Sequence, residues 1–130
     1  MTSNIILLLS HLKSAVKSKR GVLFIRRDNA SKLLLECLYR NGYISSFSVS
    51  DNRDFYKIYL KSGYSLLKFN NLRILSSPSR KIFLNFESLS KKYKPYDFFI
   101  ISTSRGLLLG HEAFVFKSGG ELLCDSFDYK

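Results

Sequence analysis

The sequence has few residues that could support a metal site or a disulfide framework. Its 130 residues include two cysteines, two histidines, two prolines and no tryptophan. Cys37 and Cys124 are too far apart in sequence for a C-x-x-C ligand pair, and no second Cys/His cluster is present, which excludes a structural zinc site. One disulfide is arithmetically possible, but both cysteines lie in apolar patterns typical of buried free thiols. We therefore expect a reducing compartment.

Long apolar runs and acidic residues are also scarce. The run over residues 5–9 is followed at once by Ser10 and His11, whereas a membrane span needs about 18 apolar residues, so we expect no membrane partner. Ten acidic residues stand against 21 lysines and arginines, a formal net charge of +11 at pH 7. With 11 Phe and 8 Tyr in the same chain, this charge indicates a polyanionic partner.

Motifs for catalysis are missing. The sequence contains no G-x-S-x-G elbow, no G-x-G-x-x-G or P-loop pattern, and no spacing from which a Ser-His-Asp triad could be built. Its carboxylates are few and isolated. We therefore expect no enzyme, no cofactor, no bound metal and no small-molecule substrate. A small hydrolase that uses Ser104 and His111 remains an alternative, which a broad esterase assay would test.

Hydrophobic periodicity predicts an α+β fold with an N-terminal lobe, residues 1–69, and a smaller, mainly β C-terminal lobe, residues 70–130. The first lobe reads as helix, strand, helix, strand, strand, at residues 5–16, 22–25, 30–38, 44–49 and 56–60. The second lobe reads as strands at residues 72–75, 80–83, 96–101, 107–109 and 121–124, with a short helix at 87–92. The first helix is basic and serine-rich, which is also the composition of an organelle transit peptide.

The first candidate binding segment ends the apolar strand that reaches residue 101. It consists of Ser102, Thr103, Ser104, Arg105 and Gly106. Small hydroxyls and bare backbone amides at a glycine turn can approach sugar 2′-hydroxyls, phosphates and base edges. An ordinary polar turn is the alternative interpretation.

A second candidate segment, Gly119, Gly120 and Glu121, begins the last strand. Glu121 is expected to accept from base amino groups or to orient neighbouring amides and hydroxyls. Pairing with a cation on an adjacent strand is the structural alternative.

Two further cationic segments are candidates for contact with the polyanionic partner. Arg80 and Lys81 precede Phe83, a mixture of charge and aromatic typical of stacking surfaces, although a phenylalanine is more often a core residue. Arg26 and Arg27 are expected to contact phosphates without sequence preference.

In chain order, these segments resemble the bacterial-type family of small ribosomal subunit protein eight. The family pattern S-T-S-[KR]-G, followed about a dozen residues later by G-G-E-[VIL]-L-C, is matched here by residues 102–106 and 119–124. Upstream, residues 29–44 resemble the family's second helix and its exit, and residues 76–83 resemble its turn S-R-P-G-x-R-x-Y. The resemblance spans residues 5–124, and it favours a mature first helix over a transit peptide.

Some positions depart from the family pattern. Ser79 replaces the usual glycine, and Phe83 replaces a tyrosine. The helix that normally begins T-D-[RK]-E-A-R reads Leu-Gly-His-Glu-Ala-Phe at residues 109–114, without the cap and the two cations. We therefore expect a weakened helix and fewer phosphate contacts. Residues 125–130 extend beyond the family's usual end.

The resemblance implies a structural protein that binds the central domain of small-subunit rRNA, mainly through its C-terminal lobe, and that supports assembly beside neighbouring small-subunit ribosomal proteins. A composition typical of AT-rich genomes and the divergent signature point to a mitochondrial ribosome, with a plastid or the bacterial cytoplasm as alternatives. A free-standing basic DNA-binding or regulatory protein is the competing function, although no helix-turn-helix spacing supports it.

Overall fold

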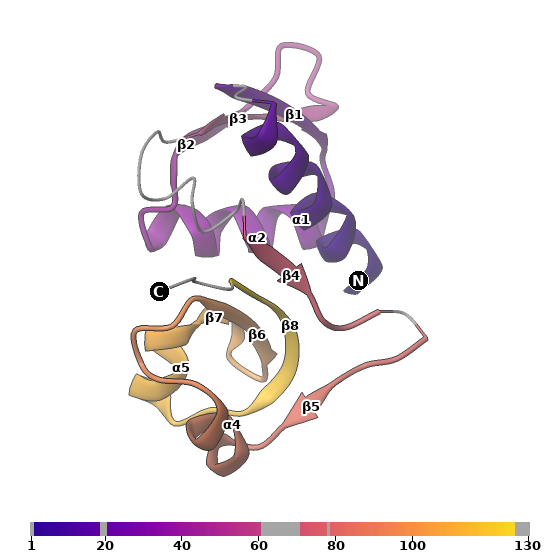
Figure 1. The fold of residues 1–130 in the computed structure, drawn as a ribbon. Helices are drawn as coiled ribbons and strands as arrows, with labels where there is room; N and C mark the ends of the chain where they lie inside the picture. Colours follow the sequence, from indigo (N-terminus) through magenta and orange to yellow (C-terminus); the bar gives the residue numbers. More distant parts are fainter. Residues whose placement is uncertain (1, 19–20, 61–70, 78, 127–130) are drawn as a thin grey trace.

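The computed structural model describes residues 2–18, 21–60, 71–77 and 79–126 of the chain. It has the α+β fold that the sequence predicts (Figure 1). The helices are α1 (Thr2–Lys17), α2 (Asn29–Arg40), α4 (Phe86–Lys92) and α5 (Gly110–Phe116). The strands are β1 (Val22–Arg26), β2 (Ile44–Val49), β3 (Phe55–Leu60), β4 (Leu72–Ile74), β5 (Phe83–Leu84), β6 (Phe99–Thr103), β7 (Gly106–Leu109) and β8 (Gly120–Ser126). The predicted lobe boundary at residues 69 and 70 lies outside the described residues, and that division stays a prediction.

The first sheet, here called sheet A, is antiparallel in the order β1-β3-β2. Its central strand β3 pairs Lys57 with Phe24 on one side and with Ser48 on the other. Because side chains alternate along a strand, these three residues share one face of the sheet. The predicted hairpin of residues 44–60 is therefore confirmed, and β1 completes the sheet on its far edge.

The second sheet, sheet B, has the order β4-β8-β6-β7, with β5 also paired to β8. The sequence pattern predicts a strand at residues 72–75, a turn at residues 76–79 and a strand again at residues 80–83, and Ser77 and Arg80 do form an antiparallel bridge at this turn. Both segments pair with β8 and run in the same direction along it, Ile74 opposite Cys124 and Phe83 opposite Glu121. The two segments form one edge strand interrupted by a loop, because β8, with seven residues, is long enough to pair with both of them.

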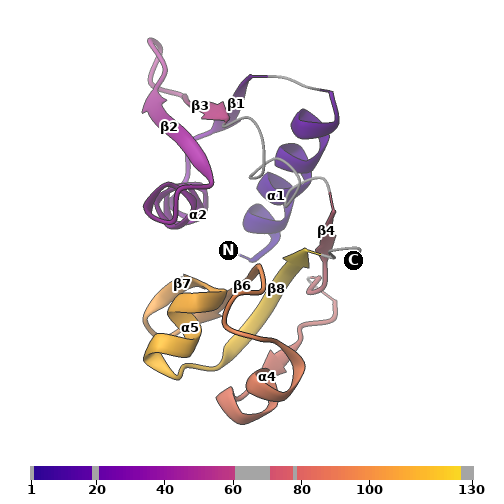
Figure 2. The same ribbon diagram turned by 60° about the vertical axis from the view of Figure 1, so that its left-hand side comes forward.

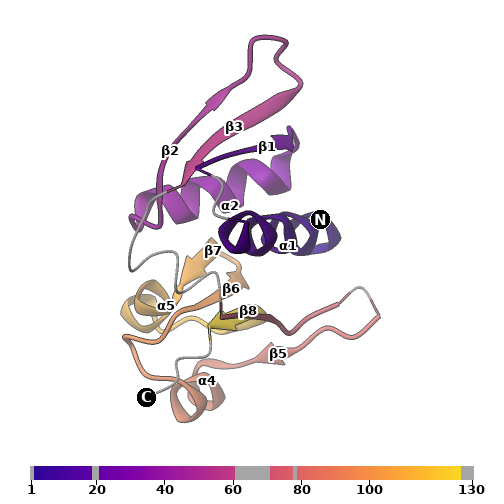
Figure 3. The same ribbon diagram turned by 45° about the horizontal axis from the view of Figure 1, so that its top comes forward.

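Helices α1 and α2 lie between the two sheets, and α4 and α5 cover the other face of sheet B (Figures 2 and 3). Alternation along β6 explains this layering. Ile100 packs in a cluster with α1, α2 and sheet A, whereas Phe99 and Ile101 pack with Leu89 of α4 and Ala113 of α5. One hydrophobic cluster thus contains residues from both sheets, which ties the two halves of the chain together.

Local caps explain where the shorter helices begin. The Asp28 carboxylate accepts from the Ser31 amide at 2.6 Å and starts α2, and the Asn85 side chain accepts from the Ser88 amide at 2.8 Å and starts α4. The prediction of a weakened helix at residues 109–114 is wrong in its main point, because α5 forms over seven residues.

Both cysteines are buried and free, as the sequence predicts. Burial raises the pKa of Cys37 to about 12 and also raises the pKa of Cys124. Among the described residues, no helix is long and apolar enough to cross a membrane.

Candidate nucleic-acid interface

The strand register brings three predicted segments together at one end of sheet B. They are residues 102–106, residues 119–121 and Phe83, the last residue of the cationic segment 80–83. Glu121 of β8 lies opposite Phe83 of β5 on one side and opposite Ser102 of β6 on the other. In the next row, Gly120 lies opposite Leu84. Three segments that are about 20 residues apart in sequence therefore form one continuous row across the strands at this end of the sheet. We call this row, with the adjoining hairpin turn, the edge of sheet B.

A tight hairpin forms the tip of this edge. Thr103 pairs with Gly106, so Ser104 and Arg105 are the two exposed residues of the turn. The Thr103 hydroxyl donates to the Gly106 carbonyl and accepts from the Arg105 amide, both at 3.0 Å. Thr103 thus builds the turn, and its capacity for RNA contact is reduced. Within the part of the chain that the structure describes, the Ser104 hydroxyl has no hydrogen-bond partner.

Close backbone approach explains the glycine pair that begins β8. A Cβ atom on Gly119 would lie 2.7 Å from the Asn85 Cα atom, and one on Gly120 would collide with the Ser102 carbonyl oxygen. Bare backbone at these positions lets β8 pass between β5 and β6. The glycines therefore have a packing role, whichever ligand the edge binds.

Glu121 and Phe83 are neighbours in the register but differ in exposure. Glu121 is buried, with 7% of its surface exposed, whereas 67% of Phe83 is exposed. The alternative that Phe83 belongs to the core is wrong, and its ring is open for stacking. The burial of Glu121 favours orientation of neighbouring groups over direct contact with a base, and its contact with RNA stays a prediction.

Arg80 and Lys81 lie on the loop that interrupts the edge strand and projects from sheet B (Figure 3). Both side chains are exposed. The loop is anchored by the buried Ser76, whose hydroxyl donates to the Leu122 carbonyl at 2.5 Å and accepts from the Ile82 amide at 3.1 Å. Sequence reasoning missed this anchor, since a serine in a turn carries no signal of its burial.

One contact adds a residue to the site that the sequence did not indicate. The Arg105 guanidinium carbon lies 4.6 Å from the centre of the Phe116 ring at the end of α5. A guanidinium held flat over an aromatic ring keeps its donors free for phosphates. No local pattern links these two residues, which are brought together by the packing of α5 on sheet B.

Arg26 and Arg27 lie apart from this edge, at the end of β1 in sheet A. The Arg27 guanidinium donates to the Arg53 carbonyl at 2.8 Å and lies 5.6 Å from the centre of the Tyr56 ring. Both arginines are exposed. Their contact with phosphates stays a prediction.

Comparison with known proteins identifies the family. The sequence matches the family model for ribosomal protein S8 over residues 4–127. The chain belongs to the ribosomal protein S8 family. A protein of Borrelia garinii subsp. bavariensis named small ribosomal subunit protein uS8 is 32% identical over 120 residues, which cover 90% of this chain and 91% of that protein. The uS8 protein of Borreliella burgdorferi (strain ZS7) is 30% identical over 125 residues, with the same coverage. The protein uS8c of Glycine max is 27% identical over 123 residues, 90% of this chain and 92% of that protein.

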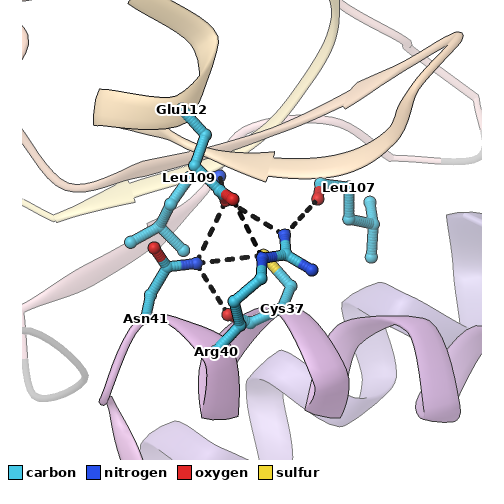
Figure 4. Close-up of polar contacts among 6 residues, drawn as sticks. All are labelled: Cys37, Arg40, Asn41, Leu107, Leu109 and Glu112. Atoms are coloured by element: carbon cyan, nitrogen blue, oxygen red, sulfur yellow. Dashed lines mark hydrogen bonds and ion pairs between the residues drawn. The ribbon is translucent and has the colours of Figure 1, made fainter. Parts of the chain in front are cut away.

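S8-family members are structural ribosomal proteins rather than enzymes. The unusual start of α5 in this S8-family chain has a structural explanation (Figure 4). The Glu112 carboxylate accepts from the Leu109 amide at 3.1 Å, and so caps the helix without the family's Thr-Asp pair. The same carboxylate accepts from Arg40 Nε at 2.9 Å, from Arg40 Nη2 at 3.0 Å and from Asn41 Nδ2 at 3.1 Å, both residues at the end of α2.

This cluster shapes the titration of Glu112. Partial burial raises the pKa of the carboxyl, but the hydrogen bonds from Arg40, Leu109 and Asn41 outweigh it, so the pKa is lowered overall. The Glu112 carboxylate thus joins the end of α2 to α5, the helix that lies between the two S8-family signature segments at residues 102–106 and 119–124.

Proposed function

We propose that this S8-family protein binds the central domain of small-subunit rRNA, mainly through the edge of sheet B, and supports the folding of that domain during subunit assembly. The observation that carries the proposal is the strand register, which aligns Ser102, Glu121 and Phe83 across three strands. Neighbouring small-subunit ribosomal proteins are the other partners of such a constituent.

The edge offers three kinds of contact with RNA. The hairpin presents the Ser104 hydroxyl, which suits sugars and base edges, and the exposed Phe83 ring suits stacking. Arg105, Arg80 and Lys81 supply positive charge for phosphates. This combination of bare backbone, hydroxyl, ring and cation favours an irregular RNA helix over a regular duplex.

A mitochondrial ribosome is the cellular setting that we propose. The divergence at the start of α5 and the composition of the chain support an organellar origin. The bacterial and plant relatives fit a bacterial or plastid ribosome as well. Sedimentation of the tagged protein with ribosomal subunits from each compartment distinguishes these settings.

Binding of single variants to a hairpin from the central domain of the rRNA tests the function. Ser104→Ala removes one hydrogen bond, about 1 kcal/mol or roughly a five-fold loss of affinity, without a change in thermal stability. Ser14→Ala, which removes an exposed hydroxyl on α1, is the matched control and should bind like the parent. Equal affinity for a scrambled hairpin would refute the proposal, and a preference for duplex DNA would support the competing DNA-binding function.

The salt dependence of the same binding reports on the phosphate contacts. We expect log affinity to fall with log salt at a slope of about four to six. Joint replacement of Arg26 and Arg27 by Ala should weaken all RNAs about equally and reduce the slope. Selective loss for one rRNA element would show that these arginines contribute to specificity instead.

A further inference from the structure

In the part of the chain that the structure describes, the outer face of sheet A is largely open to solvent. Helices α1 and α2 pack on its inner face, between the two sheets (Figure 3). On the opposite face, Phe24 and Phe55 border a hollow that also reaches Leu7 and His11 of α1 at the β1 edge. Two large rings on the outer face are open to solvent, Phe24 with 55% and Phe55 with 36% of their surface exposed. The third aromatic residue of this face, Tyr59, is half-buried. Exposed rings on an outer sheet surface indicate a binding surface.

Cations are interleaved with these rings. The Lys57 ammonium lies 5.9 Å from the centre of the Phe24 ring and 5.2 Å from the centre of the Tyr59 ring, so it sits between the two. Arg26 lies opposite Phe55 in the register. Among the described strand residues of this face, two are cations and none is acidic. The charge of the face is therefore complementary to a phosphate backbone.

A hollow of about 270 Å³ lies beside the two exposed rings. It is lined by Phe24 and Phe55 and by three residues of the turn between β2 and β3, Ser50, Asp51 and Asn52. Hydrogen bonds inside the turn hold its shape, because Asn52 Oδ1 accepts from the Ser50 hydroxyl at 2.7 Å and from the Asp54 amide at 3.2 Å. The hollow thus combines aromatic walls with polar groups and the Asp51 carboxylate at one rim, while the cations Arg26 and Lys57 lie on the strands of the face.

We propose that this outer face binds unpaired nucleotides of RNA, with bases stacked on Phe24 and Phe55 and with phosphates held by Lys57 and Arg26. The inference rests on the proposed RNA-binding function but assigns a second contact surface, on a different sheet from the candidate edge. Every base has a π-face, so a surface of this kind tolerates different sequences and needs only an unstacked strand.

An apolar segment of a neighbouring protein is the other possible occupant of the rings. Two observations favour nucleotides. Lys57 is centred between two aromatic rings, where a hydrophobic peptide would have to desolvate it without a partner. The face also lacks acidic strand residues within the described chain, as a phosphate partner requires and an apolar partner does not.

The test measures binding of a fluorescent ten-nucleotide oligoadenylate and, in parallel, of the central-domain hairpin. Stacking is worth about 1–3 kcal/mol per base, so Phe24→Ala should weaken binding of the oligonucleotide about five-fold to one hundred-fold. Phe24→Leu keeps apolar surface but removes the aromatic face, and should also lose affinity, whereas Phe24→Tyr should retain it. Tyr96→Leu is the matched control, since Tyr96 is 77% exposed on the other half of the molecule. Thermal melts of each variant verify that the fold is intact.

The outcomes separate the two proposals. Loss of oligonucleotide binding in Phe24→Leu, with hairpin binding retained through the edge of sheet B, supports the second surface. Equal binding of the oligonucleotide by the parent and Phe24→Leu overturns it. The second surface is also refuted if the parent protein binds the hairpin but not the oligonucleotide, and in that case the proposed function is unaffected. If the parent binds neither RNA, both proposals fail.

Photo-crosslinking in intact small subunits tests the identity of the occupant. A nucleotide attached to a peptide that contains Phe24 or Phe55 supports the inference. Chemical cross-links from Lys57 to another protein, without any nucleotide on these peptides, would show a protein partner and overturn it.

Discussion

Replacement of Glu112 tests whether the polar cluster between α2 and α5 holds the two sheets together. The carboxylate receives four hydrogen bonds, two of them from Arg40. Its side chain is 15% exposed and that of Arg40 is 51% exposed. Glu112→Ala removes the acceptor for all four donors. Glu112→Gln keeps one oxygen and removes the charge.

The magnitude follows from the exposure of the partners. A hydrogen bond to a charged group is worth about 1.5–3 kcal/mol, but the half-exposed Arg40 regains water when its partner is lost. We therefore expect Glu112→Ala to lower the free energy of unfolding by about 2 kcal/mol, a fall of roughly 8 °C in Tm for a chain of this size. Glu112→Gln should lower the free energy of unfolding by about 1 kcal/mol.

Denaturant and thermal unfolding measure these changes, with Glu87→Gln as the matched control. Glu87 pairs with Lys91 at 3.6 Å within α4, and both side chains are more than three-quarters exposed. Such a pair contributes less than about 0.5 kcal/mol. Equal effects of Glu112→Gln and Glu87→Gln would refute the reasoning. A double-mutant cycle with Arg40→Ala should show coupling, and strict additivity would mean that the two groups act independently.

The same cluster predicts a pH dependence. The folded pKa of Glu112 is lowered, because the hydrogen bonds to its carboxylate outweigh the effect of burial. A lowered pKa contributes stability that is fully present above the unfolded pKa, about 4.3, and is lost as the pH falls through the folded pKa. The parent should therefore lose stability in acid more steeply than Glu112→Gln. Parallel curves below pH 4.5 would contradict this.

Three further predictions concern packing. Gly120→Ala should lower the free energy of unfolding by about 2 kcal/mol or more in a denaturant titration because its Cβ meets backbone, whereas Gly21→Ala, with open space around the new atom, should cost less than about 0.5 kcal/mol. Ser76→Ala should lower the free energy of unfolding by about 2 kcal/mol in the same assay, because the buried Leu122 carbonyl and the partly buried Ile82 amide lose their partner. Cys37, whose pKa is raised to about 12, should react with a thiol reagent at pH 8 only after denaturation, and fast labelling of the folded protein would contradict its burial.

Local patterns predicted most of the fold. The helices and strands of sheet A lie where hydrophobic spacing and turn residues place them, because these signals act between residues close in sequence. These local signals did not predict which strand pairs with residues 83–84. Whether an edge segment pairs with its neighbour in sequence or with β8, some 40 residues later, depends on the length of β8 and on the Ser76 anchor. Neither is visible in the local sequence.

The candidate site shows the same division. The hydroxyl turn and the glycine pair stand out in the sequence because short hydroxyl residues and glycines mark the ends of apolar strands. The stack of Arg105 on Phe116 does not, since an exposed phenylalanine at a helix end carries no signal of its partner. The burial of Asp125, which bonds Arg73 at 2.9 and 2.8 Å and Tyr93 at 2.6 Å, is likewise set by tertiary packing. Residue 125 thus belongs to β8 rather than to a tail.

The departure at the start of α5 explains why a lost motif need not mean a lost element. Without the Thr-Asp pair, the sequence indicates an uncapped helix, yet Glu112 reaches back to the Leu109 amide and also binds Arg40 on α2. Arg40 in turn donates to the Leu107 carbonyl at 3.4 Å, and Leu107 lies opposite Ser102 in the register. The carboxylate that caps α5 therefore also helps to hold α2 beside β7, the strand that follows the hydroxyl turn. The helix cap and the contact between α5 and α2 therefore depend on one side chain, and Glu112→Ala should remove both together.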